Sequence, residues 1–201
     1  MSLFKKSLLL IILLLIIDQV VKIWIKTHMT IGQEFNVFGD WAKIHFLENP
    51  GMAFGLKWGG DTGKLMLSTF RLAAIAILTW YLYTIAEKKY PKIIVFGVAL
   101  ILAGAIGNIL DSAFYGLIFS ESTYGTVAKL FPENGGYAGF LHGSVVDMLY
   151  FPMINGTFPS WIPFYGGKSF TFFSPVFNIA DSCVTIGVAL IIIFRKKFAK
   201  T

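Results

Sequence analysis

Residues 7–25 read SLLLIILLLIIDQVVKIWI, and this stretch decides the class of fold. A helix needs about 20 mostly apolar residues to cross the hydrocarbon core of a bilayer. Lys5 and Lys6 precede the stretch, as basic residues precede the apolar core of a cleavable signal peptide. No small-residue cleavage site follows, and Asp18 and Lys22 stand where that site would be. We therefore interpret the stretch as a retained membrane helix.

The composition extends this interpretation to the whole chain. The sequence is 56% hydrophobic and only 14% charged, with a mean hydropathy of +0.70. The net charge of +6 does not indicate a nucleic-acid partner, because the basic residues flank long apolar runs. The 201 residues predict a single all-α membrane domain, residues 1–201. Its four predicted transmembrane helices span residues 7–25, 65–86, 93–113 and 176–194.

The distribution of lysine and arginine predicts the orientation in the membrane. Short cytoplasmic flanks are enriched in these residues. With four crossings, Lys5, Lys6, Lys88, Lys89, Lys92, Arg195, Lys196, Lys197 and Lys200 all fall on one side, so both termini are expected in the cytoplasm. Residues 27–64 and 112–175 then form extended outer segments. Residues 37–46 alternate weakly between apolar and polar side chains, which predicts a small β-containing element outside the membrane.

Carboxylates inside the predicted spans are the first functional signal. A charge at bilayer depth is costly and usually has a function. Only Asp18, Asp111 and Asp181 lie within the predicted spans, and all three fall in the outer halves of their helices. Three helices thus bring carboxylates to one depth, where Asp147 from the second outer segment can join them.

The local spacing separates structural carboxylates from catalytic candidates. Asp18 and Lys22 have the i, i+4 spacing of an intrahelical ion pair, which favours a structural role. A structural role is also favoured for Asp111, which shares a helix face with Asn108. Asp181 shares a face with Asn178 but has no cation within a helical turn. Such a carboxylate needs a distant partner or a shared proton.

Peptide hydrolysis by two aspartates needs such a shared proton. One ionised carboxylate takes a proton from water while a protonated one polarises the scissile carbonyl. Asp181 and Asp147 are the candidates for this pair. A proton or cation transporter that uses the buried carboxylates is the alternative. A zinc site is not expected, because the histidines are scattered and no His-Glu-x-x-His motif is present.

Five motifs, read in order, resemble the lipoprotein signal peptidase family, also called signal peptidase II. Any one of these matches is weak, but five in order are specific. They are Asp18-Gln19-Val20-Val21-Lys22, Asn49-Pro50-Gly51-Met52-Ala53-Phe54-Gly55, Gly107-Asn108-Ile109-Leu110-Asp111, Gly143-Ser144-Val145-Val146-Asp147 and Phe177-Asn178-Ile179-Ala180-Asp181.

The resemblance implies a membrane aspartic endopeptidase of the bacterial inner membrane. It would remove signal peptides from diacylglyceryl-modified prolipoproteins at the outer face of the membrane, cleaving on the amino side of the lipid-bearing cysteine. By motif match Asp147 and Asp181 would be the catalytic pair. The resemblance implies no metal or organic cofactor, and we expect a monomer in contact with membrane lipids. Supporting or substrate-binding residues would be Asn49, Gly51, Asn108, Asp111, Asn178, Ala180, Asp18 and Lys22.

The chain departs from the family pattern in two places. The family usually has arginine directly after the aspartate of the third helix, where this chain has Ser112. Arg71 or a loop lysine could replace that cation, and Ser112→Arg is expected to be tolerated. The aromatic segment 151–173 predicts an amphipathic lid over the site. Small residues such as Gly104 and Gly107 predict an opening for the substrate between the third and fourth helices.

Overall fold

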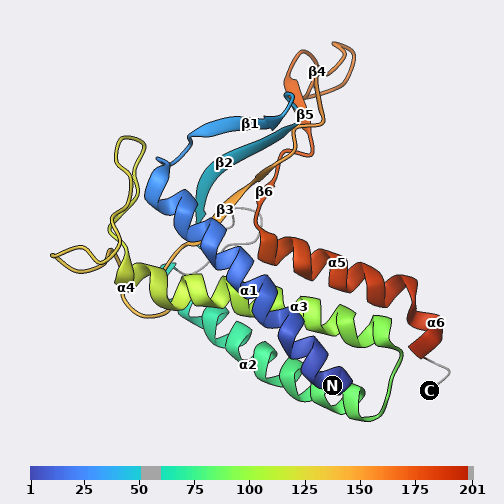
Figure 1. Cartoon of the computed structure of the whole chain (residues 1–201). Helices are drawn as coiled ribbons and strands as arrows, with labels where there is room; N and C mark the ends of the chain where they lie inside the picture. The colour runs from blue at the N-terminus through green and yellow to red at the C-terminus, as the bar shows by residue number, and fades with distance from the viewer. Residues whose placement is uncertain (51–59, 199–201) are drawn as a thin grey trace.

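Four long helices form the body of the protein (Figure 1). The computed structural model describes residues 1–50 and 60–198. Among these residues, three helices are long and apolar enough to cross a membrane, and α5 has only 15 residues. The helices are α1 (Leu3–His28), α2 (Gly60–Glu87), α3 (Lys92–Leu110), the π-helical turn η1 (Asp111–Tyr115), α4 (Gly116–Ile118), α5 (Ile179–Ile193) and α6 (Arg195–Phe198).

Helix α3 is the centre of the helical body. Of the three long apolar helices, it has the largest share of residues buried inside the protein. Leu82 of α2 packs in one hydrophobic core with Ile94 and Leu102 of α3. On the opposite faces, α1 exposes Ile16 and α2 exposes Phe70, as expected where a helix meets lipid instead of protein.

Helices α3 and α5 pack too closely to leave the opening predicted between them. A Cβ atom added at Gly104 would collide with the carbonyl oxygen of Ala180 and lie 2.6 Å from Cγ2 of Val184. One added at Gly107 would lie 3.0 Å from Cβ of Ala180. Small residues bring two helix backbones together in membranes. The predicted opening is therefore wrong, because the glycines are filled by the neighbouring helix.

A four-stranded antiparallel sheet lies across one end of the helices. Its order is β1 (Glu34–Phe38), β2 (Ala42–Asn49), β3 (Val145–Tyr150) and β6 (Val176–Phe177). The sequence predicts strands in the first outer segment, and β1 and β2 are found there. It does not predict β3 and β6, so the protein has more β-structure than the predicted all-α fold. Because Val176 pairs with Tyr150, the last long helix begins at Ile179 and not at the predicted residue 176.

A second, two-stranded sheet is formed by β4 (Ile154–Thr157) and β5 (Ser169–Phe172). Figure 1 shows this hairpin projecting away from the helices instead of folding back over them. The predicted lid is therefore not the arrangement found. The segment makes its own β-ladder, with Ile154 opposite Phe172 and Thr157 opposite Ser169.

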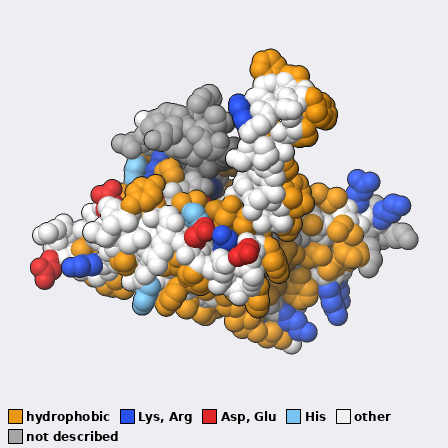
Figure 2. Space-filling view, turned by 90° about the horizontal axis from the view of Figure 1, so that it is seen from above, with side chains coloured by type: hydrophobic (Ala, Val, Ile, Leu, Met, Phe, Trp, Pro, Cys, Tyr) orange, Lys and Arg blue, Asp and Glu red, His pale blue; other side chains and the backbone are white. Residues whose placement is uncertain are grey.

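The two ends of the chain lie at the same end of the helical body, away from the sheet (Figure 1). Lysine and arginine side chains gather at that end in the space-filling view (Figure 2). The rest of the helical body presents mainly hydrophobic side chains in the same view.

Candidate active site

Asp181 is positioned by the start of α5. Asn178 is the N-cap residue, and its side-chain Oδ1 accepts a hydrogen bond of 2.8 Å from the backbone N–H of Asp181. The Asp181 carboxylate in turn accepts one from the backbone N–H of Asn178 at 3.4 Å. This reciprocal capping box satisfies two backbone donors that a helix leaves open at its first turn. It also holds Asp181 where the helix dipole favours a negative charge.

Asp147 comes from the middle of β3. Its neighbours Val146 and Met148 are fully buried in the core between the sheet and the C-terminal end of α1. Successive side chains of a strand point to opposite faces, so Asp147 points away from that core, towards α5. The strand that opposes β3 ends at Asn49, whose side chain hydrogen-bonds the Asp147 carboxyl group.

Two amide side chains bridge the two aspartates. Nδ2 of Asn178 donates to Oδ1 of Asp147 at 2.7 Å and to Oδ1 of Asn108 at 3.1 Å. Nδ2 of Asn108 donates to Oδ1 of Asp181 at 2.7 Å. Both carboxylates thus belong to one hydrogen-bond network, which joins β3, α3 and the start of α5.

Burial changes the acidity of Asp147. Its side chain is 5% exposed, and desolvation together with the negative charge of Asp181 raises its pKa from 3.8 to about 7. Hydrogen bonds from Asn178 and Asn49 lower the pKa of Asp147, but their effect is smaller than that of desolvation and of the Asp181 charge. Two adjacent carboxylates with one shared proton are the arrangement that aspartic peptidases use.

Lys22 supports this network from α1. Its Nζ lies 2.9 Å from Oδ2 of Asp18 and 2.8 Å from Oδ2 of Asp111, and it donates to Oδ1 of Asn108 at 3.1 Å. The Lys22 side chain has no exposed surface. The ion pair predicted between Asp18 and Lys22 is therefore present, and Lys22 also orients Asn108.

Asp18 and Asp111 each tie a helix to another element. Oδ1 of Asp18 accepts the backbone N–H of Ala180 at 3.0 Å, which is one of the open donors of α5. Oδ2 of Asp111 accepts the backbone N–H of Val146, next to Asp147, at 3.2 Å. Both carboxylates are thus engaged in holding the elements that carry Asp181 and Asp147.

The structure brings together nine of the ten residues predicted for the site. Gly51, with most of its motif, lies outside the described residues. The contacts made by Gln19 and by Lys26 were not predicted. Gln19 donates to Asp111 at 2.8 Å and accepts from the Tyr115 hydroxyl at 3.1 Å. Its place in the quoted Asp-Gln-x-x-Lys motif was the signal for it.

Lys26 was missed although it lies one turn beyond Lys22 on the same helix. Its ammonium group forms a buried ion pair with Glu48 and donates to the Ser122 hydroxyl at 2.9 Å. It also lies 4.9 Å from the centre of the Tyr137 ring. Glu48 directly precedes Asn49 in β2. The i, i+4, i+8 spacing of Asp18, Lys22 and Lys26 marks one helix face and could have revealed it.

The corner around Ser112 is closed. Ser112 is 2% exposed, and its backbone carbonyl accepts the N–H of Gly143 at 2.8 Å. The tolerance expected for Ser112→Arg requires an open position at the end of the helix, whereas the segment between Asp111 and Asp147 covers Ser112. A lysine does bind loop backbone here: Nζ of Lys64 donates to the carbonyl oxygen of His142 at 2.6 Å.

Comparisons with known proteins identify the family of the chain. The family model described as Signal peptidase (SPase) II matches residues 10–196. A lipoprotein signal peptidase of Porphyromonas gingivalis is 52% identical over 185 residues, which cover 92% of this chain and 80% of that protein. One of Amoebophilus asiaticus is 37% identical over 188 residues, which cover 92% and 75%.

Two solved structures are similar to this chain over most of its length. A bacterial membrane enzyme structure obtained by the in meso method at 2.3 Å resolution aligns with a TM-score of 0.59 and 26% identity, covering 98% of this chain and 92% of that one. A second such structure, at 1.9 Å, aligns with a TM-score of 0.58 and 29% identity, covering 94% and 91%. Together with the family match, these similarities show that the chain belongs to the signal peptidase II family.

Proposed function

We propose that this protein removes signal peptides from diacylglyceryl-modified prolipoproteins and that Asp147 and Asp181 are its catalytic pair. The activity follows from membership of the signal peptidase II family. One observation carries the assignment of the pair: Asn178 caps the helix that bears Asp181 and hydrogen-bonds Asp147 at 2.7 Å. Other buried carboxylates of the site, Asp18 and Asp111, are engaged by Lys22.

The two aspartates have different roles in this proposal. Asp147, with a pKa of about 7, carries the shared proton, and Asp181 carries the negative charge in the first turn of α5. Asp181 takes a proton from water as the water oxygen attacks the scissile carbonyl carbon, and Asp147 gives its proton to the carbonyl oxygen. Collapse of the tetrahedral intermediate then breaks the C–N bond. The leaving amine takes the proton held by Asp181, and a hydroxyl proton of the intermediate returns to Asp147.

The amides Asn178, Asn108 and Asn49 position the pair in this proposal, with Lys22, Asp18, Asp111 and the backbone of Ala180 behind them. Neutral donors hold carboxylate oxygens without the charge of a lysine, which would stabilise both ionised forms and remove the shared proton. Gly51 remains a proposed substrate contact on the strength of its motif alone. No step of this mechanism needs a metal or an organic cofactor.

We further propose four crossings of the bacterial inner membrane, with both termini in the cytoplasm and the site at the outer face. Support comes from the shared location of the two termini and the basic side chains beside them (Figures 1 and 2). Helix α5 has 15 residues, and α6 (Arg195–Phe198) follows it directly with basic residues that suit a cytoplasmic surface. We expect the protein to act as a monomer among membrane lipids.

The substrate is proposed to arrive sideways from the lipid, because its signal peptide is a membrane helix and its cysteine carries acyl chains. It cannot enter between α3 and α5, because these two helices are in tight contact. Arg71 of α2 lies within electrostatic reach of Asp181 and Asp111, so the outer part of α2 faces the site. We therefore propose entry along the side of α5 that faces α2.

A purified-protein assay tests the proposal directly. The protein is incubated with a diacylglyceryl-modified prolipoprotein and with an unlipidated precursor of the same sequence. Cleavage at the amino side of the cysteine is expected for the lipidated form and far slower cleavage for the other. Asp181→Asn should abolish both. Normal cleavage by folded Asp181→Asn would contradict the catalytic pair, and equal rates for the two precursors would contradict lateral recognition of the lipid.

A further inference from the structure

The hairpin formed by β4 and β5 carries an exposed aromatic tip. Trp161 is 79% exposed, Phe164 is 90% exposed and Tyr165 is 57% exposed. Ile154 and Phe172, at the base of the hairpin, are 58% and 57% exposed. Contiguous exposed apolar surface of this kind usually marks an interaction site. None of these side chains takes part in the catalytic network described above.

The charge of the hairpin indicates which kind of partner the aromatic tip can bind. Between residues 151 and 175 the sequence has one charged residue, Lys168, and no carboxylate. Nζ of Lys168 lies 5.4 Å from the centre of the Tyr165 ring, so the cation sits beside the aromatic tip. Tryptophan and tyrosine favour the boundary between lipid and water, and basic residues there are attracted to lipid phosphates.

Several backbone groups of the tip are hydrogen-bonded within the hairpin. Phe158 N–H donates to the carbonyl of Lys168, Gly167 N–H to that of Phe158, and Gly166 N–H to that of Ile162, each at 2.9 Å. The Phe158 ring packs on those of Tyr165 and Phe170, with centres 5.7 and 4.7 Å apart. Backbone groups that enter lipid must be paired internally, and these hydrogen bonds lower the cost of seating the tip at the boundary between lipid and water.

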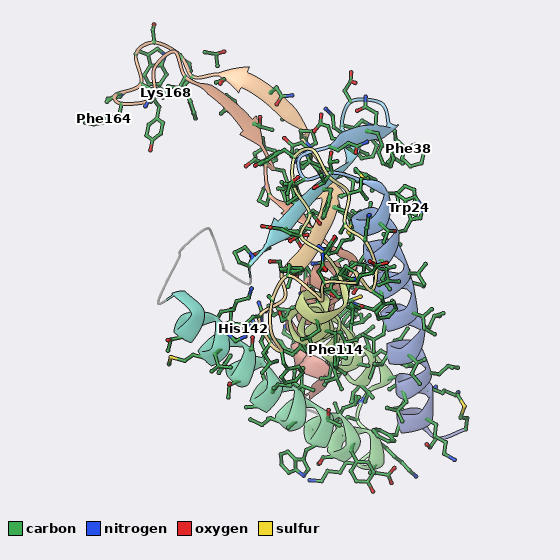
Figure 3. The ribbon with its side chains drawn as sticks, turned by 90° about the vertical axis from the view of Figure 1, so that its left-hand side faces the viewer. Trp24, Phe38, Phe114, His142, Phe164 and Lys168 are labelled. Atoms are coloured by element: carbon green, nitrogen blue, oxygen red, sulfur yellow. The ribbon has the colours of Figure 1, made fainter. Side chains whose placement is uncertain are left out.

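The direction of the hairpin brings the tip towards the bilayer surface. In Figure 1 the helices run from lower right to upper left, and the hairpin leaves the sheet to one side of that line. Figure 3 shows Phe164 and Lys168 at its tip, well away from Phe114 and His142 at the outer end of α3. A segment that extends sideways from a set of membrane-crossing helices runs along the membrane and not out into water.

From these observations we propose that the hairpin tip, residues 158–168, is a membrane anchor seated among the lipid headgroups of the outer leaflet. The aromatic rings occupy the boundary with the acyl chains, and Lys168 faces lipid phosphates. The anchor holds the sheet at a set height, because β4 follows directly on β3, the strand of Asp147. The proposal does not depend on the peptidase assignment.

Spin labelling tests the position of the tip. Cys183 is the only cysteine of the chain, so Cys183→Ala gives a background without thiols. Phe164→Cys is labelled with a nitroxide in this background, and Tyr124→Cys serves as the matched control. Tyr124 is an 83% exposed aromatic of the other outer loop. Both proteins are placed in bilayers of phosphatidylethanolamine and phosphatidylglycerol, and collisions with oxygen and with a water-soluble nickel chelate are measured.

The label at position 164 is expected to collide more with oxygen than with nickel, as lipid-embedded labels do, and the label at 124 to show the reverse. Lys168→Glu should shift the label at 164 towards water, and Lys168→Gln should shift it less. If nickel reaches 164 as readily as 124, the hairpin lies in water and the anchor is refuted. The exposed aromatic tip would then have to bind a soluble protein partner or the substrate instead of lipid.

Discussion

Nδ2 of Asn178 lies 2.7 Å from Oδ1 of Asp147, while Oδ1 of the same side chain accepts the backbone N–H of Asp181. One amide therefore sets the position of a carboxyl group on a strand relative to one on a helix. The helix cap and the contact to Asp147, a proposed catalytic group, thus share one side chain, so changes at residue 178 should separate folding from catalysis.

Asn178→Asp is expected to fold and to lose most activity. An aspartate keeps the acceptor that caps α5, but it replaces the amide donor to Asp147 with a third carboxyl group, whose negative charge lies beside that of Asp181. Asn178→Ala should lose the cap as well, which costs about 1 kcal/mol of stability, and should also be nearly inactive. Thermal unfolding in detergent and prolipoprotein cleavage are measured together. Full activity of Asn178→Asp would show that the contact to Asp147 is unimportant.

Asp147→Asn and Asp181→Asn should each lower cleavage by about 10⁴-fold, as expected for members of one catalytic unit. The double variant should be scarcely worse than either single variant, because the unit fails once either member is lost. Glu133→Gln, which alters an exposed outer-loop carboxylate, is the control and should remain active. Multiplied losses in the double variant would mean that the two aspartates act independently.

The raised pKa of Asp147 predicts a specific dependence of stability on pH. Its folded pKa of about 7 lies above its ordinary value of 3.8, so folding favours the protonated form. The contribution of Asp147 to stability is therefore full below about pH 4 and is lost as the pH rises to about 7. Asparagine mimics the neutral form. Asp147→Asn should thus gain in Tm relative to the wild type between pH 5 and pH 8, and a pH-independent difference would contradict the raised pKa.

Lys22→Met should destabilise the protein by about 3–5 kcal/mol, because it leaves Asp18 and Asp111 buried without their cation. Asp18→Asn should also act mainly on stability, since Asp18 holds the backbone of α5 and is not one of the proposed catalytic groups. Thermal unfolding and the yield of folded protein in detergent measure both effects. Lys43→Met, at an exposed ion pair with Glu34, is the control and should change stability little.

Ser112→Arg is now expected to impair folding, contrary to what the sequence predicts, because the position is 2% exposed and closed by the backbone of Gly143. Lys64→Met tests whether the lysine of α2 replaces the family arginine by holding the carbonyl of His142. It should lower both activity and stability, and Lys64→Arg should restore part of each. A stable and active Ser112→Arg would contradict the closed corner.

The sequence reveals the charged residues of the candidate site better than it reveals how the strands pair and the helices pack. Asp18, Asp111 and Asp181 could be found because a carboxylate within an apolar span is costly and therefore conspicuous. Lys22 was found by its spacing from Asp18, and Asp147, which lies outside the predicted spans, by its motif. The strand status of Asp147 could not be found, because Val145–Tyr150 is a short apolar run whose pairing partner is β2, about a hundred residues earlier. Likewise, Gly104 looked like open space because the sequence does not reveal which backbone fills a glycine.

The pairing of β3 with β6 has a consequence for how this protein could have evolved. Tyr150 lies opposite Val176, so residues 151–175 leave the sheet and return to it at a single point. An excursion of this kind can be gained, lengthened or lost without altering the register of Asp147 or the cap of Asp181. The hairpin can therefore diverge among descendants of one ancestor while the proposed catalytic pair is inherited unchanged, and a short turn in its place should yield a minimal enzyme.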